Sequence, residues 1–559
     1  MDEPLGAMVN QVPQFGPVTG TPPVLKSGKV IEVGASRAQR LWSAVNRSPG
    51  QALAALIVFY IAIVFAQAAT KLLWCDELIT LAIARQGSLA AIWRALAAGA
   101  DPNPPLSHWL TLESTRAFGQ SALAVRLPAI VCVLLAVVCL WAILRRWVCP
   151  GYAAVGVLAF MATRGFDYAY EARSYAPLMG FAMASLALWL VSTEQRGTIR
   201  FVALAGMAAT LALGVCSNYY GVLAFFPIAV AEAVRLFSSG RGARRMQSGA
   251  WVAMALAAAP LLAFLPLIRH NLTEFAPHAW NRPSAGMIVD SYLVLVEGVF
   301  WPVLGLAMVV VWKRRESGHP TKSQSSGSAL KPYEATALGV LLLYPILGFA
   351  VALSGGGMIS ARCVVPVCCG FGIAAALLGR RVFGDNARVG LILLSGALFW
   401  VVARESVCAI VLAQQRNAFC EFRNRIASQP GNRPIVVGDS LFVLPLAHYS
   451  SEDVRERIVF PIDFDAIHRF EPDDSLEQNL WAGRGNVFRV RIIPYSCLPL
   501  EGKEFTVIAR PGGWLARSLS GDSMLLNDST PDPAWQELGG VFTPMAHDGT
   551  SLLLARNPR

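Results

Sequence analysis

The chain has 559 residues, of which 55% are hydrophobic and 15% are charged, and its formal net charge is +11 at pH 7. Long apolar runs recur from residue 51 to about residue 412, which excludes a single large soluble core and predicts a polytopic membrane protein. Because no basic surface interleaved with aromatic residues is apparent, we expect no nucleic-acid partner.

The first 50 residues are polar and contain several prolines and glycines. The apolar run that follows lies too deep in the chain, and is too long, for an ordinary cleaved signal peptide. We therefore interpret residues 1–50 as a disordered cytoplasmic leader and residues 51–412 as a transmembrane domain. A bilayer helix needs about 20 residues, so the apolar runs predict about eleven spans: 51–69, 122–144, 151–168, 175–193, 200–215, 219–236, 248–268, 291–312, 334–354, 361–378 and 388–411.

The distribution of Lys and Arg predicts the orientation, since cationic loops resist translocation. With a cytoplasmic N-terminus, the basic pairs all fall on the inner side, for example Arg145–Arg146 and Arg380–Arg381. An odd number of spans then places the C-terminal part outside. We expect a multi-pass protein surrounded by membrane lipids, in a bacterial inner membrane.

The first outer loop, residues 70–121, is unusually long. It contains the amphipathic segments "ELITLAIARQGSLAAIWRALAAG" and "PLSHWLTLESTRAFG", with Trp93 and Trp109 among their apolar residues. Apolar residues at helical spacing are typical of helices that lie in the membrane interface. The loop is therefore predicted to work at the membrane surface.

Beyond residue 412 the apolar runs become short and rich in Val and Ile, as in "PIVVGDSLFVLPLAHY", "NVFRVRIIPY" and "EFTVIARPG". Such runs between Gly, Pro and Asp turns predict a compact α/β domain outside the membrane at 413–559, with a possible helix at 415–428. Cys420 and Cys497 lie in this region and could form a disulfide in an oxidising compartment.

In this topology, polar clusters at the span ends gather on the outer face. Five of them, in order and spacing, resemble the outer-loop motifs of C-type (GT-C) membrane glycosyltransferases, a superfamily that includes protein O-mannosyltransferases and lipid A aminoarabinose transferases. The motifs are "WCDE" (74–77), "NPPLSHWL" (103–110), "EARSYAP" (171–177), "SNYYGVL" (217–223) and "SARCVVP" (360–366). The resemblance covers roughly residues 50–412.

The resemblance implies a GT-C-like helical bundle. It also implies transfer of a sugar from a polyprenyl-phosphate donor to a lipid, glycan or protein acceptor outside the membrane, with inversion at the anomeric carbon. The chemistry agrees, because a lipid-phosphate sugar keeps its phosphate at the interface and its catalytic groups must lie at span ends. A carboxylate there can take the proton of the acceptor hydroxyl.

By resemblance, Asp76 is the general base, and Glu77 holds the acceptor, a water or a metal. Positive charge and hydrogen-bond donors for the departing phosphate come from Arg173, Tyr175 and Arg362. The remaining expected substrate-binding residues are Asn103, His108, Glu171, Tyr219 and Tyr220.

Two positions depart from the family pattern. Asn103 stands where aminoarabinose transferases carry a Lys, which argues against that particular activity. Cys363 replaces the aromatic residue that commonly follows the family's Arg, which weakens the assignment of Arg362.

Each of these residues also has a structural interpretation. Asp76 and Glu77 could cap the helix that follows, since carboxylates favour helix N-termini. Glu171 with Arg173 could be an exposed ion pair, and Arg362 a snorkelling anchor.

The polar and aromatic candidate site residues also have structural interpretations. Asn103 could shape the entry to a helix, His108 could be an interfacial polar residue, and Tyr219 and Tyr220 could belong to an aromatic belt. Asp76 and Glu77 could also bind a divalent cation through oxygen, but two carboxylates do not define a site, so we assign no cofactor and no metal ligand.

Two other classes of function compete with the enzyme. A transporter or flippase of a lipid-linked saccharide would also need many spans, but it should place polar groups near mid-membrane and have discontinuous helices there. A sensor or assembly factor would need the spans only as an anchor, for which the predicted number is excessive.

Overall fold

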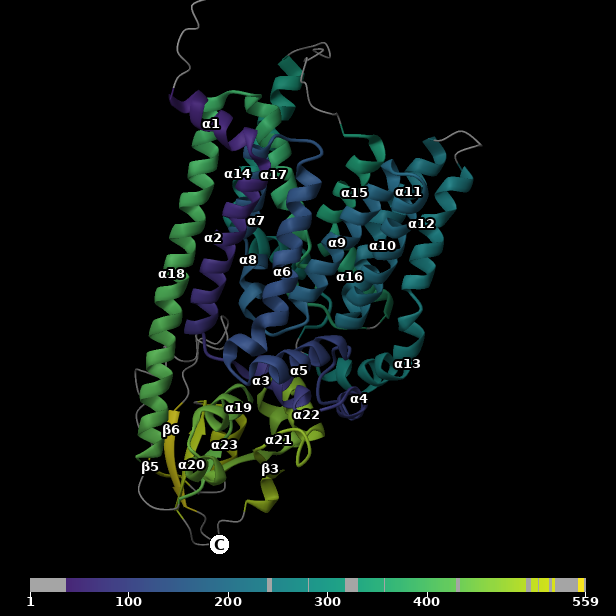
Figure 1. The fold of residues 1–559 in the computed structure, drawn as a ribbon. Helices are drawn as coiled ribbons and strands as arrows, with labels where there is room; N and C mark the ends of the chain where they lie inside the picture. Colours follow the sequence, from purple (N-terminus) through teal and green to yellow (C-terminus); the bar gives the residue numbers. More distant parts are fainter. Residues whose placement is uncertain are drawn as a thin grey trace, which may run out of the picture.

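The computed structural model describes residues 37–238, 244–279, 281–316, 330–355, 357–428, 433–498, 504–510, 512–521, 525–527 and 551–556. A long helical bundle forms one end of the molecule and an α/β domain the other, with short helices between them (Figure 1). Residues 1–36 of the expected leader lie outside the described residues. The rest of the expected leader, residues 37–50, is mostly helical. Its helix α1 (Arg37–Arg47) is held in place because Trp42 is buried against Tyr152.

Within the described residues, seven segments are long and apolar enough to cross a membrane. Two helix pairs, α12–α13 and α15–α16, are bent by 41° and 63° and raise the number to nine if each pair is one span. The seven segments are α2 (Pro49–Thr70), α6 (Ala122–Leu144), α9 (Tyr175–Glu194), α10 (Gly197–Ser217), η2 with α11 (Tyr219–Ser238), α14 (Gly286–Glu316) and α18 (Ala387–Ala427).

The bent pairs consist of α12 (Arg244–Ala257) with α13 (Pro260–His270), and α15 (Pro332–Leu342) with α16 (Tyr344–Gly355). Pro260 and Pro345 lie at the two breaks, where a residue without an N–H interrupts the helical hydrogen bonds. The expected spans 151–168 and 361–378 coincide with shorter helices, α7 (Pro150–Met161) and α17 (Val367–Phe383). The number of eleven spans therefore remains a prediction.

The first outer loop folds into α3 (Cys75–Ala84), α4 (Leu89–Ala97) and α5 (Leu106–Phe118). Gly87, at φ +79°, makes the turn that separates the first two helices, and Ser88 caps the second by accepting from the Ala91 N–H. Figure 1 shows these helices between the bundle and the α/β domain. Leu78 and Leu81 of α3 share one core cluster with residues of that domain.

The C-terminal part forms a six-stranded sheet of order β3-β2-β1-β4-β6-β5. The first four strands in this order are parallel to one another, with Val436 opposite Val459 and Val507. Strand β6 pairs antiparallel with β4 on one side and with β5 on the other. The strands are β1 (Ile435–Val437), β2 (Ile458–Ile462), β3 (Arg491–Pro494), β4 (Glu504–Ala509), β5 (Leu525–Asn527) and β6 (Ser551–Arg556). The helices are α19 (Ser440–Tyr449), α20 (Glu452–Arg457), α21 (Phe464–Phe470), α22 (Ser475–Ala482) and α23 (Trp514–Gly521).

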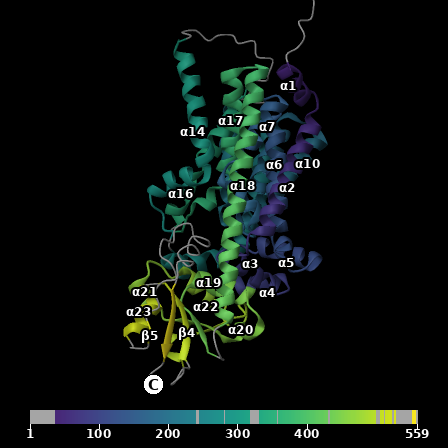
Figure 2. The same ribbon diagram turned by 90° about the vertical axis from the view of Figure 1, so that its left-hand side faces the viewer.

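Helix α18 has 41 residues and runs beside the bundle down to the sheet (Figure 2). The expected last span, 388–411, and the possible helix at 415–428 are both parts of this one helix, which continues without a break past residue 412. Its last turns bury Phe419, Phe422 and Ile426 in the core of the α/β domain. Cys420 and Cys497 are free thiols.

Candidate active site

The opening turn of α3 carries both carboxylates of the "WCDE" motif. Trp74 is extended, the helix begins at Cys75, and Asp76 and Glu77 follow as successive residues. Because successive helical side chains point about 100° apart, the two carboxylates face different surroundings. Glu77 is fully buried, whereas 19% of the Asp76 side chain is exposed.

Glu77 forms a two-point ion pair with Arg126, the fifth residue of α6. The two contacts are Nε to Oε1 at 2.8 Å and Nη2 to Oε2 at 2.6 Å, and the Ala172 N–H also donates to Oε1 at 2.8 Å. The Trp74 N–H donates to Oε2 at 3.4 Å, which is the capping contact that the structural interpretation expected. Burial opposes the ionised form, but Arg126 outweighs it and lowers the pKa of Glu77.

Asp76 faces two guanidinium groups. Its Oδ2 lies 3.2 Å from Nη1 of Arg362 and 3.6 Å from Nε of Arg173. Its Oδ1 has no hydrogen-bond partner among the residues that the structure describes. Arg362 also lies over the ring of Trp74, at 5.5 Å from the centroid, and 31% of its side chain is exposed.

Arg173 is nearly buried and connects Asp76 to Asp101. Its Nη1 donates to Asp101 Oδ2 at 2.8 Å and to the backbone oxygen of Asp76 at 3.1 Å. Asp101 accepts in turn from the backbone N–H and the Nδ2 of Asn103, at 2.8 and 2.6 Å. The oxygen of Asn103 accepts from Ser174 at 2.9 Å, so the "NPP" and "EARSYAP" segments are joined.

His108, in α5, lies near Asp101 and Arg173 of this network. Only 1% of it is exposed, and neither ring nitrogen has a partner among the side-chain hydrogen bonds of the described residues. Burial lowers the pKa of His108, although the nearby Asp101 pulls in the opposite direction. Burial therefore disfavours the charged form of this imidazole.

Four further predicted residues border the network without joining its ion pairs. Tyr175 lies near Arg362 and Arg173 and packs on Tyr168 with ring centroids 5.3 Å apart. Glu171 forms an ion pair with Lys71 at 2.5 Å. Tyr219 packs edge-on against Phe264. The hydroxyl of Tyr220 donates to the backbone oxygen of Met358 at 2.5 Å.

The structure adds Asp101, Arg126 and Lys71 to the residues that sequence analysis selected. Arg126 carried a signal, since an ionisable residue inside a predicted span is a functional suspect. Asp101 directly precedes the "PNPP" stretch but carried no signal of its own, because its partner Arg173 is 72 residues away. The geometry does not favour a cation at Asp76 and Glu77, since both carboxylates already face guanidinium groups.

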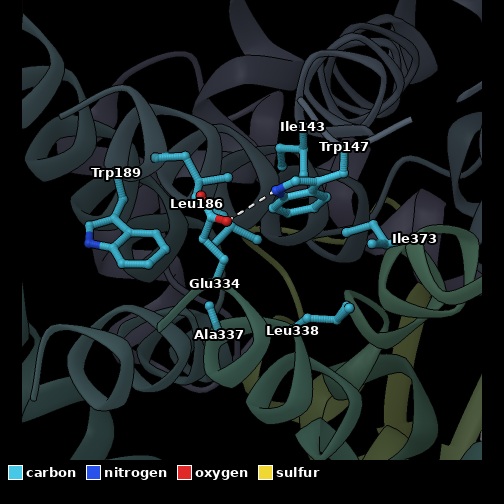
Figure 3. Close-up of a pocket in the computed structure, with 9 residues that line it drawn as sticks. Ile143, Trp147, Leu186, Trp189, Glu334, Ala337, Leu338 and Ile373 are labelled. Atoms are coloured by element: carbon cyan, nitrogen blue, oxygen red, sulfur yellow. Dashed lines mark hydrogen bonds between the residues drawn. The ribbon is translucent and has the colours of Figure 1, made fainter. Parts of the chain in front are cut away.

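A small, mostly apolar cavity lies at the far end of α6, remote from Asp76. Trp147 donates from its indole nitrogen to Glu334 Oε2 at 3.2 Å on one side of it (Figure 3). Its other labelled walls are Ile143, Leu186, Trp189, Ala337, Leu338 and Ile373. Ile143 and Trp147 lie at the C-terminal end of α6, whereas Arg126 lies near its N-terminal end, so the cavity is separate from the network around Asp76.

Residues 102–269 match the family model of dolichyl-phosphate-mannose-protein mannosyltransferases. No curated protein sequence matches the chain. The fold is similar to ArnT from Cupriavidus metallidurans in the apo state, with a TM-score of 0.55 and 15% identity over 90% of this chain and 98% of that one. ArnT bound to undecaprenyl phosphate gives a TM-score of 0.54 and 15% identity over 90% and 97% of the two chains.

At such low identity the similarity to ArnT shows the fold alone, but it extends over nearly the whole chain. The matched family segment contains Asn103 and Arg173 of this network and begins directly after Asp101. These findings confirm the fold predicted from the five motifs. They identify the chain as a multi-pass membrane protein with the GT-C glycosyltransferase fold.

Proposed function

We propose that this protein transfers a sugar from a polyprenyl-phosphate donor to an acceptor hydroxyl on the outer side of a membrane. The observation that carries the proposal is the partly exposed Asp76 carboxylate, which lies between Arg362 and Arg173 next to the outer end of the bundle. The bound undecaprenyl phosphate of ArnT, a protein of the same fold, supports a lipid phosphate as donor. The distribution of Lys and Arg supports an orientation with this end on the outer side, and we propose a bacterial inner membrane as the location.

Asp76 is the general base of the proposed reaction. Its unpartnered Oδ1 takes the proton of the acceptor hydroxyl as that oxygen attacks the anomeric carbon. The new C–O bond forms while the bond from the anomeric carbon to the phosphate oxygen breaks, and the polyprenyl phosphate leaves with the electron pair. Attack from the face opposite the phosphate inverts the anomeric carbon.

Arg362 is the phosphate-binding residue in this proposal. Its side chain is exposed at 31%, and Asp76 is its one ion-pair partner in the described part of the chain. A guanidinium group of this kind can turn from Asp76 to a phosphate and bind it at two points. Donor binding then frees Asp76 Oδ2 at the moment when the base is needed.

Arg173 and Glu77 position the reacting groups rather than touch them. Arg173 already donates to Asp101 and to the Asp76 backbone, and Glu77 has both oxygens bonded. We therefore assign neither of them direct contact with the donor phosphate or the acceptor. Tyr175, Asn103 and Glu171 border the space in which the donor headgroup would lie.

A flippase for a lipid-linked saccharide is the second candidate, because the bent pairs α12–α13 and α15–α16 are discontinuous spans of the kind that transporters use. The polar network, however, surrounds the outer ends of the helices. A transporter needs polar groups nearer mid-membrane, so this second function fits the geometry less well.

The test uses full-length protein in lipid nanodiscs with a panel of undecaprenyl-phosphate hexoses and pentoses and a cell-envelope extract as acceptor. Release of undecaprenyl phosphate is measured for the wild type and for Asp76→Asn. We expect a loss of about 10²- to 10⁴-fold in the variant, the range that general-base catalysis supplies.

Glu113→Gln is the matched control, because Glu113 is an exposed carboxylate in α5 that pairs with Arg116. It should keep full turnover, and both variants should keep the wild-type unfolding temperature. Wild-type turnover in Asp76→Asn would remove this residue from the role of base. Movement of intact lipid-linked sugar across the bilayer without its consumption would instead favour the flippase.

A further inference from the structure

A second polar cluster, outside the proposed active site, joins the membrane domain to the C-terminal domain. His278 ends the short helix η5 (Ala276–His278), which follows α13 and the π-turn η4 (Asn271–Phe275). His468 lies in α21, and Asp474 directly precedes α22. The ligand atoms of these three residues all lie within 4.8 Å of one another.

The two imidazoles converge on one carboxylate. His278 Nδ1 lies 2.9 Å from Asp474 Oδ1, and His468 Nε2 lies 2.9 Å from Asp474 Oδ2. The rings are nearly parallel, at 16°, with centroids 5.6 Å apart. Asp474 occupies the N-cap position of α22 but makes no side-chain capping hydrogen bond, so its oxygens are directed to the imidazoles.

The charge of Asp474 needs compensation. Only 1% of its side chain is exposed, and among the described residues no Lys or Arg pairs with it. A buried carboxylate without a cationic partner is costly. Gln478 donates to Oδ2 at 2.8 Å and fixes the orientation of the carboxylate, as outer hydrogen bonds do around metal ligands.

We propose that His278, His468 and Asp474 bind one Zn²⁺ ion, which fastens the C-terminal domain to the outer loop after α13. Two imidazoles and one carboxylate are a common ligand set for zinc. A tetrahedral zinc ion holds its ligand atoms about 3.3–3.6 Å apart, as follows from metal–ligand distances of about 2.0–2.2 Å. The present separations need only small side-chain movements to reach that arrangement.

The exposure of the histidines leaves access to the ion. His278 is 32% and His468 is 49% exposed, so zinc can enter from solvent and a water can be the fourth ligand. A nitrogen that binds zinc must offer a lone pair and carries no proton. Zinc binding would therefore replace the hydrogen bonds between the two imidazoles and Asp474 by bonds to the metal.

The loop that carries His278 also contacts both sides of the proposed active site. Asn271 donates to the backbone oxygen of Pro102, next to Asp101, at 2.9 Å. The backbone N–H of Ile359, three residues before Arg362, donates to the Asn281 oxygen at 2.9 Å. An ion at His278 therefore couples the position of the C-terminal domain to the segments that hold Asp101 and Arg362.

The first experiment measures zinc binding to full-length protein in nanodiscs that has been stripped with a chelator and dialysed against Zn²⁺. Metal analysis should find one zinc ion per wild-type chain, and less than about a fifth of that in His278→Gln and in Asp474→Asn. The control His448→Gln should keep one ion, because this other histidine of the C-terminal domain is not part of the cluster. No retained zinc in the wild type, or full retention in His278→Gln, would overturn the proposal.

Two measurements separate ligand loss from misfolding. Zinc should raise the unfolding temperature of the wild type and of His448→Gln but not that of His278→Gln, since a ligand of the folded state stabilises it. It should also slow amide hydrogen exchange in residues 271–279 and in α21 of the wild type. Zinc binding without slower exchange would contradict the fastening role, and neither measurement depends on sugar transfer.

Discussion

At the start of α3, the neighbouring residues Asp76 and Glu77 lie in different environments. Asp76 and Glu77 read as an equivalent pair in the sequence, but the helix turns Glu77 into a buried ion pair with Arg126 and leaves Asp76 partly exposed. The doublet alone could predict a charged site at the membrane surface. The resemblance singled out Asp76, but the doublet itself could not predict which carboxylate stays exposed, because that depends on the distant Arg126.

Asp101 is expected to act as a positioning residue. Asp101→Asn should lower kcat by on the order of 10²-fold, with little change in KM for the donor, because Arg173 loses its partner and no longer holds Asp76 in place. Steady-state kinetics with the undecaprenyl-phosphate sugar that the wild type consumes would show this split. Asp453→Asn, at an exposed position of the C-terminal domain, is the control, and a wild-type kcat for Asp101→Asn would contradict the prediction.

At the scale of elements, helix contacts depend on glycines whose role hydropathy cannot reveal. Helices α7 and α17 approach so closely that a Cβ at Gly372 would lie 2.6 Å from the Gly156 backbone oxygen, and one at Gly156 would lie 2.8 Å from the Gly372 oxygen. All twelve residues of α7 are buried, which explains why a helix too short for an ordinary span is so apolar.

Gly372→Val should therefore destabilise the bundle. Backbone atoms cannot yield to the new side chain, so we expect a loss of about 1–3 kcal/mol or more, the usual cost of overpacking. Gly396→Val in α18 is the matched control, because nothing lies within 4 Å of a Cβ there. Thermal unfolding in nanodiscs should show a lower midpoint for the first variant alone, and equal midpoints for both would refute the close contact.

Helix α18 shows a different limit of sequence interpretation. Hydropathy falls near residue 412, where the last membrane span is expected to end. The following stretch "AQQRNAFCEFRNRIA" contains neither Gly nor Pro, so nothing stops the helix when it leaves the membrane. Hydropathy marks where the bilayer ends, whereas the backbone hydrogen bonds decide where a helix ends.

At the scale of the whole molecule, buried ion pairs hold separate segments together. Arg126 of α6 binds Glu77 and also donates to the backbone oxygens of Ala68, Lys71 and Leu72, so one side chain joins α2, α3 and α6. Asp101 and Arg173 join the first outer loop to the segment before α9.

These pairs predict that the protein is less stable in acid. Burial opposes the charged carboxylates, but their Arg partners lower the pKa values of Glu77 and Asp101. In the unfolded chain these carboxyl groups have pKa values near ~4. Because the pKa values are lower in the folded state, the ion pairs stabilise the folded state fully above pH ~4. This stabilisation is lost as the pH falls through the folded-state pKa values. The unfolding temperature, followed from pH 7 to pH 3, should therefore fall steeply below pH ~4.

Glu77→Gln tests the origin of this acid sensitivity. It should lower the unfolding temperature at pH 7, because removal of one partner from a buried ion pair costs about 3–5 kcal/mol, and it should make the acid decline less steep. Glu113→Gln removes an exposed partner and should leave both properties unchanged. An unchanged acid profile in Glu77→Gln would show that other groups cause the decline.

The sequence by itself determined the membrane character, the helical class and the GT-C resemblance, because apolar runs of bilayer length and motifs at their ends are local features. It also selected Asp76, Arg173 and Arg362, which the structure brings together. Only the tertiary structure decided that Glu77 faces inward, that Asp101 completes the network and that His278 meets His468 and Asp474. Those outcomes depend on side chains that lie tens to hundreds of residues apart and become neighbours only when the helices pack.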